Sequence, residues 1–206
     1  MGGVAIPEGY RLERGWLWPA TDVGAAAVLF SSVEDLTLVY PHVKKFDVVV
    51  QAGGNCGIWP KTMGEKFRVV YTFEPDPMNF RCLCANAPAA NIFKFNASLG
   101  EEHRTTGLKL RPDNIGSHLI EGSGDIPMLR IDDLALTACD LIYLDIEGYE
   151  MNALKGGLET MRRFKPTIVA EDLGVGGSVR GEVVSWLVSE MGYTVAGKAH
   201  KDVILV

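Results

Sequence analysis

The sequence lacks any hydrophobic run long enough to cross a membrane. Its longest apolar stretch lies around Val23–Phe30, whereas a membrane-spanning helix needs roughly 20 apolar residues. Residues Met1–Tyr10 also lack the basic start and apolar segment of a signal peptide. We therefore expect a cytoplasmic protein that has no membrane partner.

Cysteine and basic residues are scarce. The four cysteines, Cys56, Cys82, Cys84 and Cys139, form no CxxC pair and no metal-binding spacing, which is typical of reduced thiols in the cytoplasm. The 20 basic residues are outnumbered by 26 acidic residues, and the formal net charge is −6. Because proteins that bind long nucleic acids usually carry a basic surplus, such a partner is not expected.

Several catalytic motifs are absent as well. The sequence has no GxSxG nucleophile elbow, no P-loop lysine motif and no HExxH zinc motif. These absences leave hydrolase and nucleoside triphosphatase functions without support. Of the four histidines, His118 is the best remaining candidate for a general base, and the others fit surface or hydrogen-bonded positions.

What the sequence does contain is a regular alternation of short apolar runs and helix-like stretches. The run Phe46–Ala52 includes three consecutive valines, as expected of a strand buried on both faces. The predicted strands are Phe46–Ala52, Arg68–Glu74, Asn91–Ala97, Asp140–Asp145 and Pro166–Asp172, with a terminal antiparallel hairpin of Tyr193–Ala196 and Val203–Val206. The predicted helices are Ile58–Lys66, Pro77–Ala87, Met151–Met161 and Val179–Met191. This alternation predicts a single doubly wound α/β domain over residues 46–206, built on a mainly parallel sheet.

Two segments lie outside this alternation. Residues 1–45 contain Trp16 and Trp18 followed by an apolar stretch, and they predict an N-terminal cap or arm packed on the core. The two tryptophans are expected to be packing residues. Residues 99–127 contain a Pro-Asp-Asn turn at 112–114 between short apolar segments, which predicts an inserted surface hairpin.

A glycine-rich turn follows the first predicted strand. Its sequence is Gly53-Gly54-Asn55-Cys56-Gly57. Glycines at this place let a ligand approach the backbone, while the next helix offers free N–H groups to an anion. A nucleotide or a carboxylate would suit such a turn, and a purely structural strand-to-helix turn is the alternative.

Glu74 ends the second predicted strand, about 20 residues beyond the glycine turn. A carboxylate at this place accepts hydrogen bonds from both hydroxyls of a ribose. Asn96, Ala97 and Ser98 follow the third strand and lie where an adenine base would reach. The glycine turn, the spacing and the strand-end acid together favour an adenosine-type ligand.

Acidic residues gather after the fourth and fifth predicted strands. Asp145 and Glu147 follow the fourth strand, and Glu171 and Asp172 end the fifth. Since these strand ends meet at one edge of a parallel sheet, Asp145, Glu171 and Asp172 are a candidate site for Mg²⁺, for a shared proton or for a basic group of the substrate. Helix capping is the alternative for Asp145 and Glu147.

The order of these motifs resembles the FkbM family of S-adenosylmethionine-dependent methyltransferases. The resemblance rests on the runs VVVQAGGNCG, VYTFEPDP, NASLG, LIYLDIEGYEMNALKGG and KPTIVAEDL. It covers residues 46–206, and its most specific part is the DIEGYE…LKGG block. Versions with an AGGN turn are similar to family members carried by bacteriophages.

The resemblance implies a Rossmann-like class I methyltransferase fold, in which a seven-stranded sheet has an antiparallel last strand. It implies that Glu74 holds the ribose hydroxyls of S-adenosylmethionine and that Asp145 lies near the cofactor's amino group or reacting methyl. The full set of expected cofactor-binding residues is Gln51, Gly53, Gly54, Asn55, Gly57, Glu74, Ala97, Ser98 and Asp145. The family usually has aspartate at the place of Gln51 and lysine at the place of Tyr143.

The expected reaction is methylation of a hydroxyl on a small molecule or glycan, with Asp145 and Glu147 as the catalytic residues. Two other functions remain open. One is a non-catalytic domain that binds S-adenosylmethionine, which the departures at Gln51 and Tyr143 would favour. The other is an NAD-dependent oxidoreductase, which shares the glycine turn and the ribose-binding acid. The aromatic N-terminal arm is also a candidate contact for a homodimer.

Overall fold

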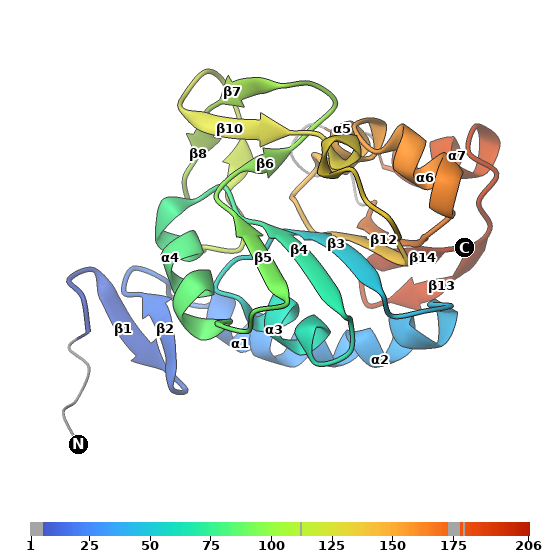
Figure 1. Ribbon diagram of the computed structural model, residues 1–206. Helices are drawn as coiled ribbons and strands as arrows, with labels where there is room; N and C mark the ends of the chain where they lie inside the picture. The colour runs from blue at the N-terminus through green and yellow to red at the C-terminus, as the bar shows by residue number, and fades with distance from the viewer. Residues whose placement is uncertain (1–5, 112, 173–177, 179) are drawn as a thin grey trace.

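The computed structural model describes residues 6–111, 113–172, 178 and 180–206, and its centre is one mainly parallel β-sheet (Figure 1). Among the described residues this sheet contains seven strands, in the order β13-β14-β12-β11-β3-β4-β5. The strands are β3 (Val48–Ala52), β4 (Val69–Phe73), β5 (Ile92–Phe95), β11 (Leu141–Leu144), β12 (Thr167–Glu171), β13 (Val195–Ala199) and β14 (Asp202–Leu205). β14 runs antiparallel to both of its neighbours, and the other paired strands of the sheet run parallel. The predicted α/β fold with an antiparallel C-terminal hairpin is confirmed.

The order of the strands reverses at β3. From β3 the chain proceeds to β4 and β5 on one side, and it later returns to form β11 and β12 on the other side. In a doubly wound sheet, ligands bind in the crevice beyond the carboxyl ends of the strands at such a reversal. The fold therefore places the candidate site between the ends of β3 and β11.

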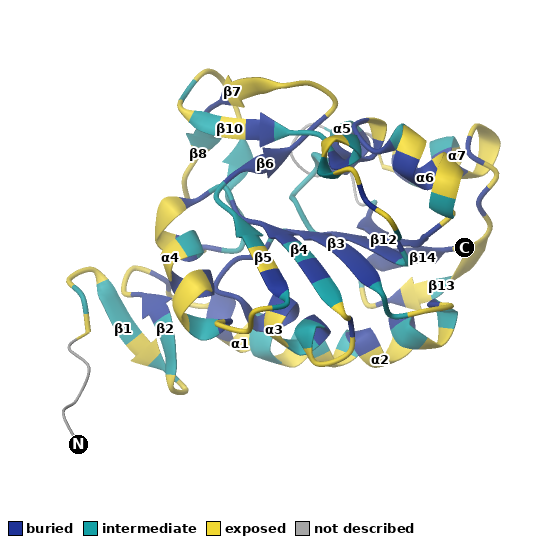
Figure 2. Cartoon of the chain, viewed as in Figure 1, coloured by how far each residue is buried: buried dark blue, intermediate teal, exposed yellow. Residues whose placement is uncertain are grey.

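The central strands of the sheet, β3, β11 and β12, are buried on both faces. Ile142 and Leu144 of β11 pack into one apolar layer, while Leu141 and Tyr143 pack into the opposite layer. None of these four side chains is more than 1% exposed, and the central strands are dark blue along most of their length (Figure 2). Burial on both faces explains why the sequence shows continuous apolar runs instead of alternation with polar residues.

Helices connect the parallel strands and cover the sheet (Figure 1). They are α3 (Ile58–Gly64), α4 (Pro77–Asn86), α5 (Glu150–Lys155), α6 (Leu158–Phe164) and α7 (Glu182–Ser189). The carboxylate of Asp76 caps α4 by accepting a hydrogen bond from the backbone N–H of Asn79. The last predicted helix is observed as α7, and residue 179, where it was expected to begin, lies outside the described residues.

The prediction of one helix over Met151–Met161 is wrong, because α5 ends at Lys155 and α6 begins at Leu158. A Cβ atom at Gly156 would overlap the carbonyl oxygen of Gly100, and one at Gly157 would lie 3.1 Å from Ile131. Two glycines also have low helix propensity. The break thus lets the backbone approach its neighbours closely, which the apolar spacing alone did not indicate.

The N-terminal segment contains a hairpin and short helices. The hairpin consists of β1 (Tyr10–Glu13) and β2 (Trp16–Pro19), and it is followed by α1 (Ala25–Ser32) and α2 (Leu36–Val39). The side chain of Asn86 joins β2 to α4 by donating to the carbonyl oxygen of Leu17 and accepting from its N–H, both at 2.9 Å. Trp18 is fully buried and stacks on Phe30, so it is a packing residue, as expected.

The segment between β5 and β11 contains the predicted hairpin, formed by β8 (Leu108–Lys109) and β9 (Leu119–Ile120). It also contains a small sheet of β6 (Ser98–Leu99), β7 (Arg104–Thr106) and β10 (Ile126–Leu129) that the sequence did not predict. These strands have only two to four residues each, and β6 and β7 carry no apolar run that would mark them as strands. None of the described helices is both long and apolar enough to cross a membrane.

Candidate functional site

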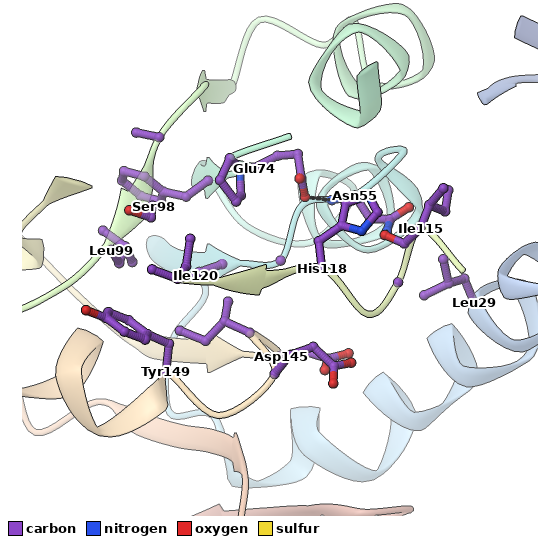
Figure 3. Close-up of a pocket in the computed structure, with 18 residues that line it drawn as sticks. Leu29, Asn55, Glu74, Ser98, Leu99, Ile115, His118, Ile120, Asp145 and Tyr149 are labelled. Atoms are coloured by element: carbon purple, nitrogen blue, oxygen red, sulfur yellow. Dashed lines mark hydrogen bonds between the residues drawn. The ribbon is translucent and has the colours of Figure 1, made fainter. Parts of the chain in front are cut away.

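A cavity opens beyond the carboxyl ends of β3, β4 and β11, at the reversal of the strand order (Figure 3). Residues of the strand ends, of α1 and of the inserted segment line it. The lining includes Leu29, Gly53, Asn55, Glu74, Ala97, Ser98, Ile115, His118, Asp145, Glu147 and Tyr149. Eight of the residues that the sequence singled out therefore surround one cavity. Gln51, Gly54 and Gly57 lie outside its lining.

The glycine turn is fixed by close backbone packing. Gly53 has φ +85°, and a Cβ atom there would overlap the carbonyl oxygen of Asp145, so glycine is required on both conformational and steric grounds. Gly54 and Gly57 instead face α4, where added Cβ atoms would lie 3.0 and 3.2 Å from Leu83. Gly53 thus borders the cavity, whereas Gly54 and Gly57 allow α4 to pack behind it.

Asn55 connects the glycine turn to the inserted segment. Its backbone N–H donates to Oε2 of Glu74 at 2.7 Å, and its side-chain amide donates to the carbonyl oxygen of Ile115 at 2.9 Å. The side chain of Asn79 donates to the same carbonyl oxygen at 3.1 Å. These hydrogen bonds hold the inserted segment over the mouth of the cavity.

Glu74 is the central acid of the cavity. Its side chain is buried, and its two oxygens accept the backbone N–H groups of Asn55 and Asp76 at 2.7 and 2.9 Å. Burial raises the pKa of Glu74 to about 8, although these two hydrogen bonds oppose the shift. A carboxylate has about four acceptor sites, so the group can still accept hydroxyl hydrogens of a ligand.

Ala97 and Ser98 line the cavity after β5, as the sequence predicted for a base-binding position. Ser98 directs its hydroxyl to the carbonyl oxygen of Pro127 at 3.3 Å. The neighbouring Asn96 donates to the carbonyl oxygens of Glu74 and Pro75. The side chain of Asn96 therefore stabilises the turn after β4. The cavity wall near Ala97 includes the apolar residues Phe73 and Leu99.

The two departures from the family pattern lie within the sheet. The amide oxygen of Gln51 accepts a hydrogen bond from the hydroxyl of Thr72, and its nitrogen donates to the carbonyl oxygen of Ala52 at 3.0 Å. The hydroxyl of Tyr143 donates to Oδ2 of Asp202 at 2.8 Å. Both side chains are satisfied inside the protein, and neither lines the cavity.

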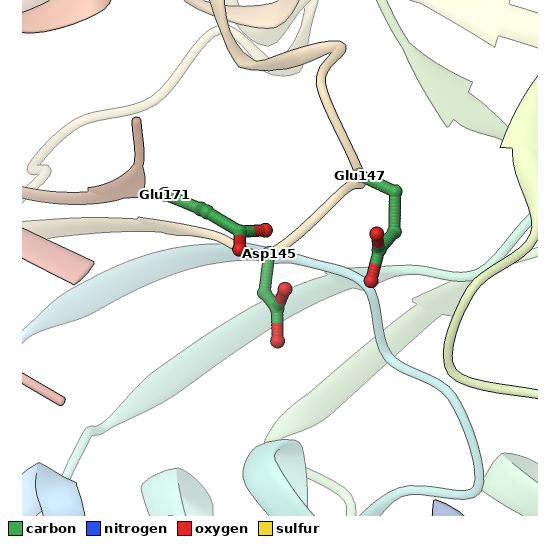
Figure 4. Close-up of side chains that lie close together, drawn as sticks. All are labelled: Asp145, Glu147 and Glu171. Carbon is green, nitrogen blue, oxygen red and sulfur yellow. The ribbon is translucent and has the colours of Figure 1, made fainter. Parts of the chain in front are cut away.

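Three carboxylates converge at one border of the cavity (Figure 4). Asp145, Glu147 and Glu171 each offer an oxygen within 4.8 Å of the others, and we call these three residues the acidic edge. The prediction that Asp172 belongs to this cluster is wrong. Its two oxygens accept the N–H groups of Gly181 and Val184 at 3.0 and 3.2 Å, which places it at the start of α7. Helix capping, which was the alternative for Asp145 and Glu147, is thus the role of Asp172.

The acidic edge already contains a cation of the chain itself. The ammonium of Lys201 lies 3.0 Å from Oε1 of Glu171 and 3.4 Å from Oδ1 of Asp145. Burial acts to lower the pKa of Lys201, but the surrounding carboxylates outweigh it and raise this pKa above its usual range. Lys201 therefore stays charged, in the position where the sequence pattern suggested Mg²⁺.

Glu147 combines an unusual backbone with an unusual acidity. Its φ is +55°, in the left-handed region that side chains rarely adopt. The buried carboxylate of Glu150 stabilises this loop by accepting the N–H groups of Ile146 and Gly148 at 3.1 and 3.3 Å. Burial, followed by the charge of Asp145, raises the pKa of Glu147 to about 7. The loop thus presents a carboxyl group that changes its protonation near neutral pH.

His118 is brought to the cavity from the inserted segment. Its Nδ1 accepts the backbone N–H of Arg111 at 3.0 Å, and burial lowers its pKa. The neutral ring therefore carries its hydrogen on Nε2. Sequence reasoning missed Ile115 and Tyr149 as lining residues. Ile115 lies far along the chain from the predicted strand ends, and Tyr149 follows Asp145 closely but belongs to no acidic or glycine pattern.

A glycine turn, a buried strand-end acid and a cavity at the strand reversal define a protein of the Rossmann-like nucleotide-binding class. Residues 47–195 match the family described as methyltransferase FkbM domain. The chain belongs to the FkbM methyltransferase family. The suggested similarity to bacteriophage-borne members stays a prediction.

A solved structure of the same family shows the same fold. The methyltransferase FkbM from Methylobacillus flagellatus KT is 19% identical with a TM-score of 0.53, and the match covers 89% of this chain and 55% of that one. This chain thus spans about half the length of that structure. The N-methyltransferase NodS from Bradyrhizobium japonicum WM9 is 13% identical with a TM-score of 0.49, over 88% of this chain and 95% of that one. A comparison with curated proteins finds no match.

Proposed function

We propose that this protein is an S-adenosylmethionine-dependent methyltransferase that methylates a hydroxyl of a small molecule or glycan. The observation that carries the proposal is the buried Glu74, whose oxygens are oriented by the N–H groups of Asn55 and Asp76 inside the cavity. Membership of the FkbM family supports the same activity.

The residues of the cavity fit this cofactor. Gly53 and Asn55 line the part of the cavity where the methionine part would lie. The oxygens of Glu74, oriented by the N–H groups of Asn55 and Asp76, would accept the ribose hydroxyls. Ala97 and Ser98 would contact the base. Gln51 is bonded to Thr72 within the sheet, so it is not expected to bind the cofactor's ammonium directly.

In the proposed mechanism, the bound cofactor supplies an electrophilic methyl group, and the chain orients the acceptor and removes its proton. Glu147 is the general base, since its pKa of about 7 is close to neutral pH. Asp145 lies between Glu147 and Lys201 and positions the acceptor. We assign the positive charge at the acidic edge to Lys201, so the proposal includes no Mg²⁺.

The alternatives make different predictions. An NAD-dependent oxidoreductase would bind NAD in the same cavity, and a non-catalytic domain would bind S-adenosylmethionine without turnover. The side chain of Gln51 does not by itself favour the second, because it lies outside the cavity. The proposed homodimer contact through the N-terminal arm has no bearing on this choice.

Calorimetric titration with S-adenosylhomocysteine tests the proposal. We expect micromolar binding, no comparable binding of NAD, and loss of binding in Glu74→Ala, because the ribose hydroxyls lose their acceptor. The control is Glu65→Gln, which changes an exposed acid at the end of α3. Preferential binding of NAD would contradict the proposal.

A further inference from the structure

A second groove adjoins the cofactor cavity. It lies between α1, the loop before β9 and the turn that precedes β14. Leu29, Gly116, Asp145 and Glu147 line both the groove and the cavity. A ligand in the groove therefore reaches the proposed general base at the border with the cofactor cavity.

One wall of the groove is apolar and open to solvent. Val23 and Val28 line it and are 83% and 64% exposed. Trp59 lines the same groove from α3, and its side chain is buried. These apolar residues suit the carbon skeleton of a ligand and leave polar recognition to the other lining residues.

The groove is also lined by acidic residues. Asp35, Asp145, Glu147 and Asp202 line it together with Lys201. The charge of Lys201 is already engaged by Asp145 and by Glu171, which lies behind the groove. The groove therefore keeps a negative excess, which repels an anionic ligand and attracts a cationic one.

Two buried carboxylate oxygens lack a donor. Asp202 and Glu171 are each 5% exposed. Among the described residues, neither Oδ1 of Asp202 nor Oε2 of Glu171 has a hydrogen-bond partner. The other oxygen of Asp202 accepts the hydroxyl of Tyr143. A buried acceptor without a partner is unfavourable, so a ligand that brings a donor to Asp202 would satisfy it.

We infer that the groove binds the methyl acceptor and selects one that carries a protonated amine beside its hydroxyl groups, as in an amino sugar. This inference rests on the proposed function and adds the class of acceptor. The ammonium group donates to Asp202 and is attracted by Asp35, while the apolar wall contacts the ring. A hydroxyl of the same molecule then lies near Glu147, at the border with the cofactor cavity.

The transfer step is balanced without a further reagent. The hydroxyl oxygen forms a bond to the methyl carbon as the bond between this carbon and the cofactor sulfur breaks, and the electron pair of that bond stays on sulfur. The hydroxyl proton passes to Glu147. The ammonium keeps its proton and takes part only in binding.

The test uses matched ligands and protein saturated with S-adenosylhomocysteine. The probes are glucosamine, kanamycin and 2-deoxystreptamine, each compared with its N-acetylated form by saturation-transfer NMR and calorimetry. We expect at least one amine to bind about tenfold more tightly than its N-acetylated form. Asp202→Asn and Asp35→Asn should each reduce this preference several-fold.

The control variant is Glu34→Gln, which neutralises an exposed acid next to Asp35 that does not line the groove. It should keep the preference for amines. Asp35 has no side-chain capping bond at the start of α2, so Asp35→Asn remains informative if Asp202→Asn fails to fold.

Equal binding of amines and N-acetylated forms, or no binding of any amine, would overturn the inference. The binding of S-adenosylhomocysteine to the same sample separates the two levels of the argument. If this ligand binds and the amines do not, the acceptor class is wrong and the proposed function stands. If this ligand does not bind, the proposed function itself fails.

Discussion

The ammonium of Lys201 lies 3.0 Å from Oε1 of Glu171 and joins the turn before β14 to the end of β12. Lys201 also lies 3.4 Å from Asp145. One lysine thus compensates two of the three carboxylates of the acidic edge. The third, Glu147, is influenced by the same positive charge, which lowers its pKa against the effects of burial and Asp145.

Lys201→Met should shift the pH dependence of turnover. Glu147 acts as a base only when it is ionised, so activity should rise with pH through a midpoint near its pKa of about 7. Removal of the ammonium raises this pKa, and the midpoint should move to higher pH. The pH profile of kcat with an identified acceptor measures the change. Lys198→Met, an exposed lysine on β13, should leave the midpoint in place, and an equal shift in both variants would contradict the assignment.

Binding of S-adenosylhomocysteine should strengthen as the pH rises. The ribose hydroxyls donate to an ionised Glu74, whereas burial raises its pKa to about 8. Below this pH, a proton must leave before the ligand binds, so the dissociation constant should fall by up to about tenfold for each unit of increase. Above about pH 8 the affinity should level off.

Calorimetry at a series of pH values measures this dependence. Glu74→Gln cannot ionise, so its affinity should be weaker and nearly independent of pH. Glu65→Gln should retain the dependence of the original protein. A flat profile in the original protein would show that Glu74 is already ionised in the free site.

Gly53→Ala should destabilise the protein more than Gly15→Ala, although the two glycines have the same backbone conformation. Gly53 and Gly15 have φ values of +85° and +84°, but a Cβ atom has nothing within 4 Å at Gly15 and overlaps Asp145 at Gly53. Gly15→Ala should cost about 1 kcal/mol from backbone strain. Gly53→Ala should cost several kcal/mol and also weaken binding of S-adenosylhomocysteine.

Urea unfolding of the two variants under the same conditions isolates the steric contribution at Gly53. Because both positions require the left-handed conformation, the difference between the two free energies reports the overlap with Asp145. Similar losses in both variants would mean that the turn after β3 can move away from β11 without a large penalty.

The sheet and part of the site were predictable because they depend on residues that are close in sequence. The run Phe46–Ala52 is apolar throughout, since β3 is buried on both faces, and Gly53 and Glu74 directly follow strands. Strand ends of a parallel sheet share one edge, so the grouping of Asp145 with Glu171 follows from the alternation alone.

The remaining features depend on contacts between distant segments. Lys201 reaches Asp145 from the turn before β14, and Ile115 is held by Asn55 across the inserted segment. No local pattern marks either contact. Asp172 was misplaced for a related reason, because a strand-end acid serves equally well as a helix cap, and only the position of α7 decides between the two roles.

Asp202→Asn should make the stability of the protein less dependent on pH. Burial, followed by the charge of Asp145, raises the pKa of Asp202 to about 7, although Tyr143 and Lys201 oppose the shift. The folded state therefore binds this proton more tightly than the unfolded state does. The stabilisation that protonated Asp202 provides is fully present below the ordinary pKa of 3.8 and is lost as the pH rises to about 7.

Urea unfolding of the protein without ligand, at a series of pH values, measures this effect. Asparagine keeps an acceptor for Tyr143 and carries no charge. The free energy of unfolding of Asp202→Asn, minus that of the original protein, should therefore increase by about 2 kcal/mol between acidic and neutral pH. The control is Asp47→Asn. Asp47 precedes β3, at the edge of the sheet away from the cavity, and its half-exposed side chain pairs with Arg68. This variant should show no comparable increase. A constant difference across this range would mean that Asp202 is ionised throughout in the folded protein, compensated by Lys201 and Tyr143 despite its burial.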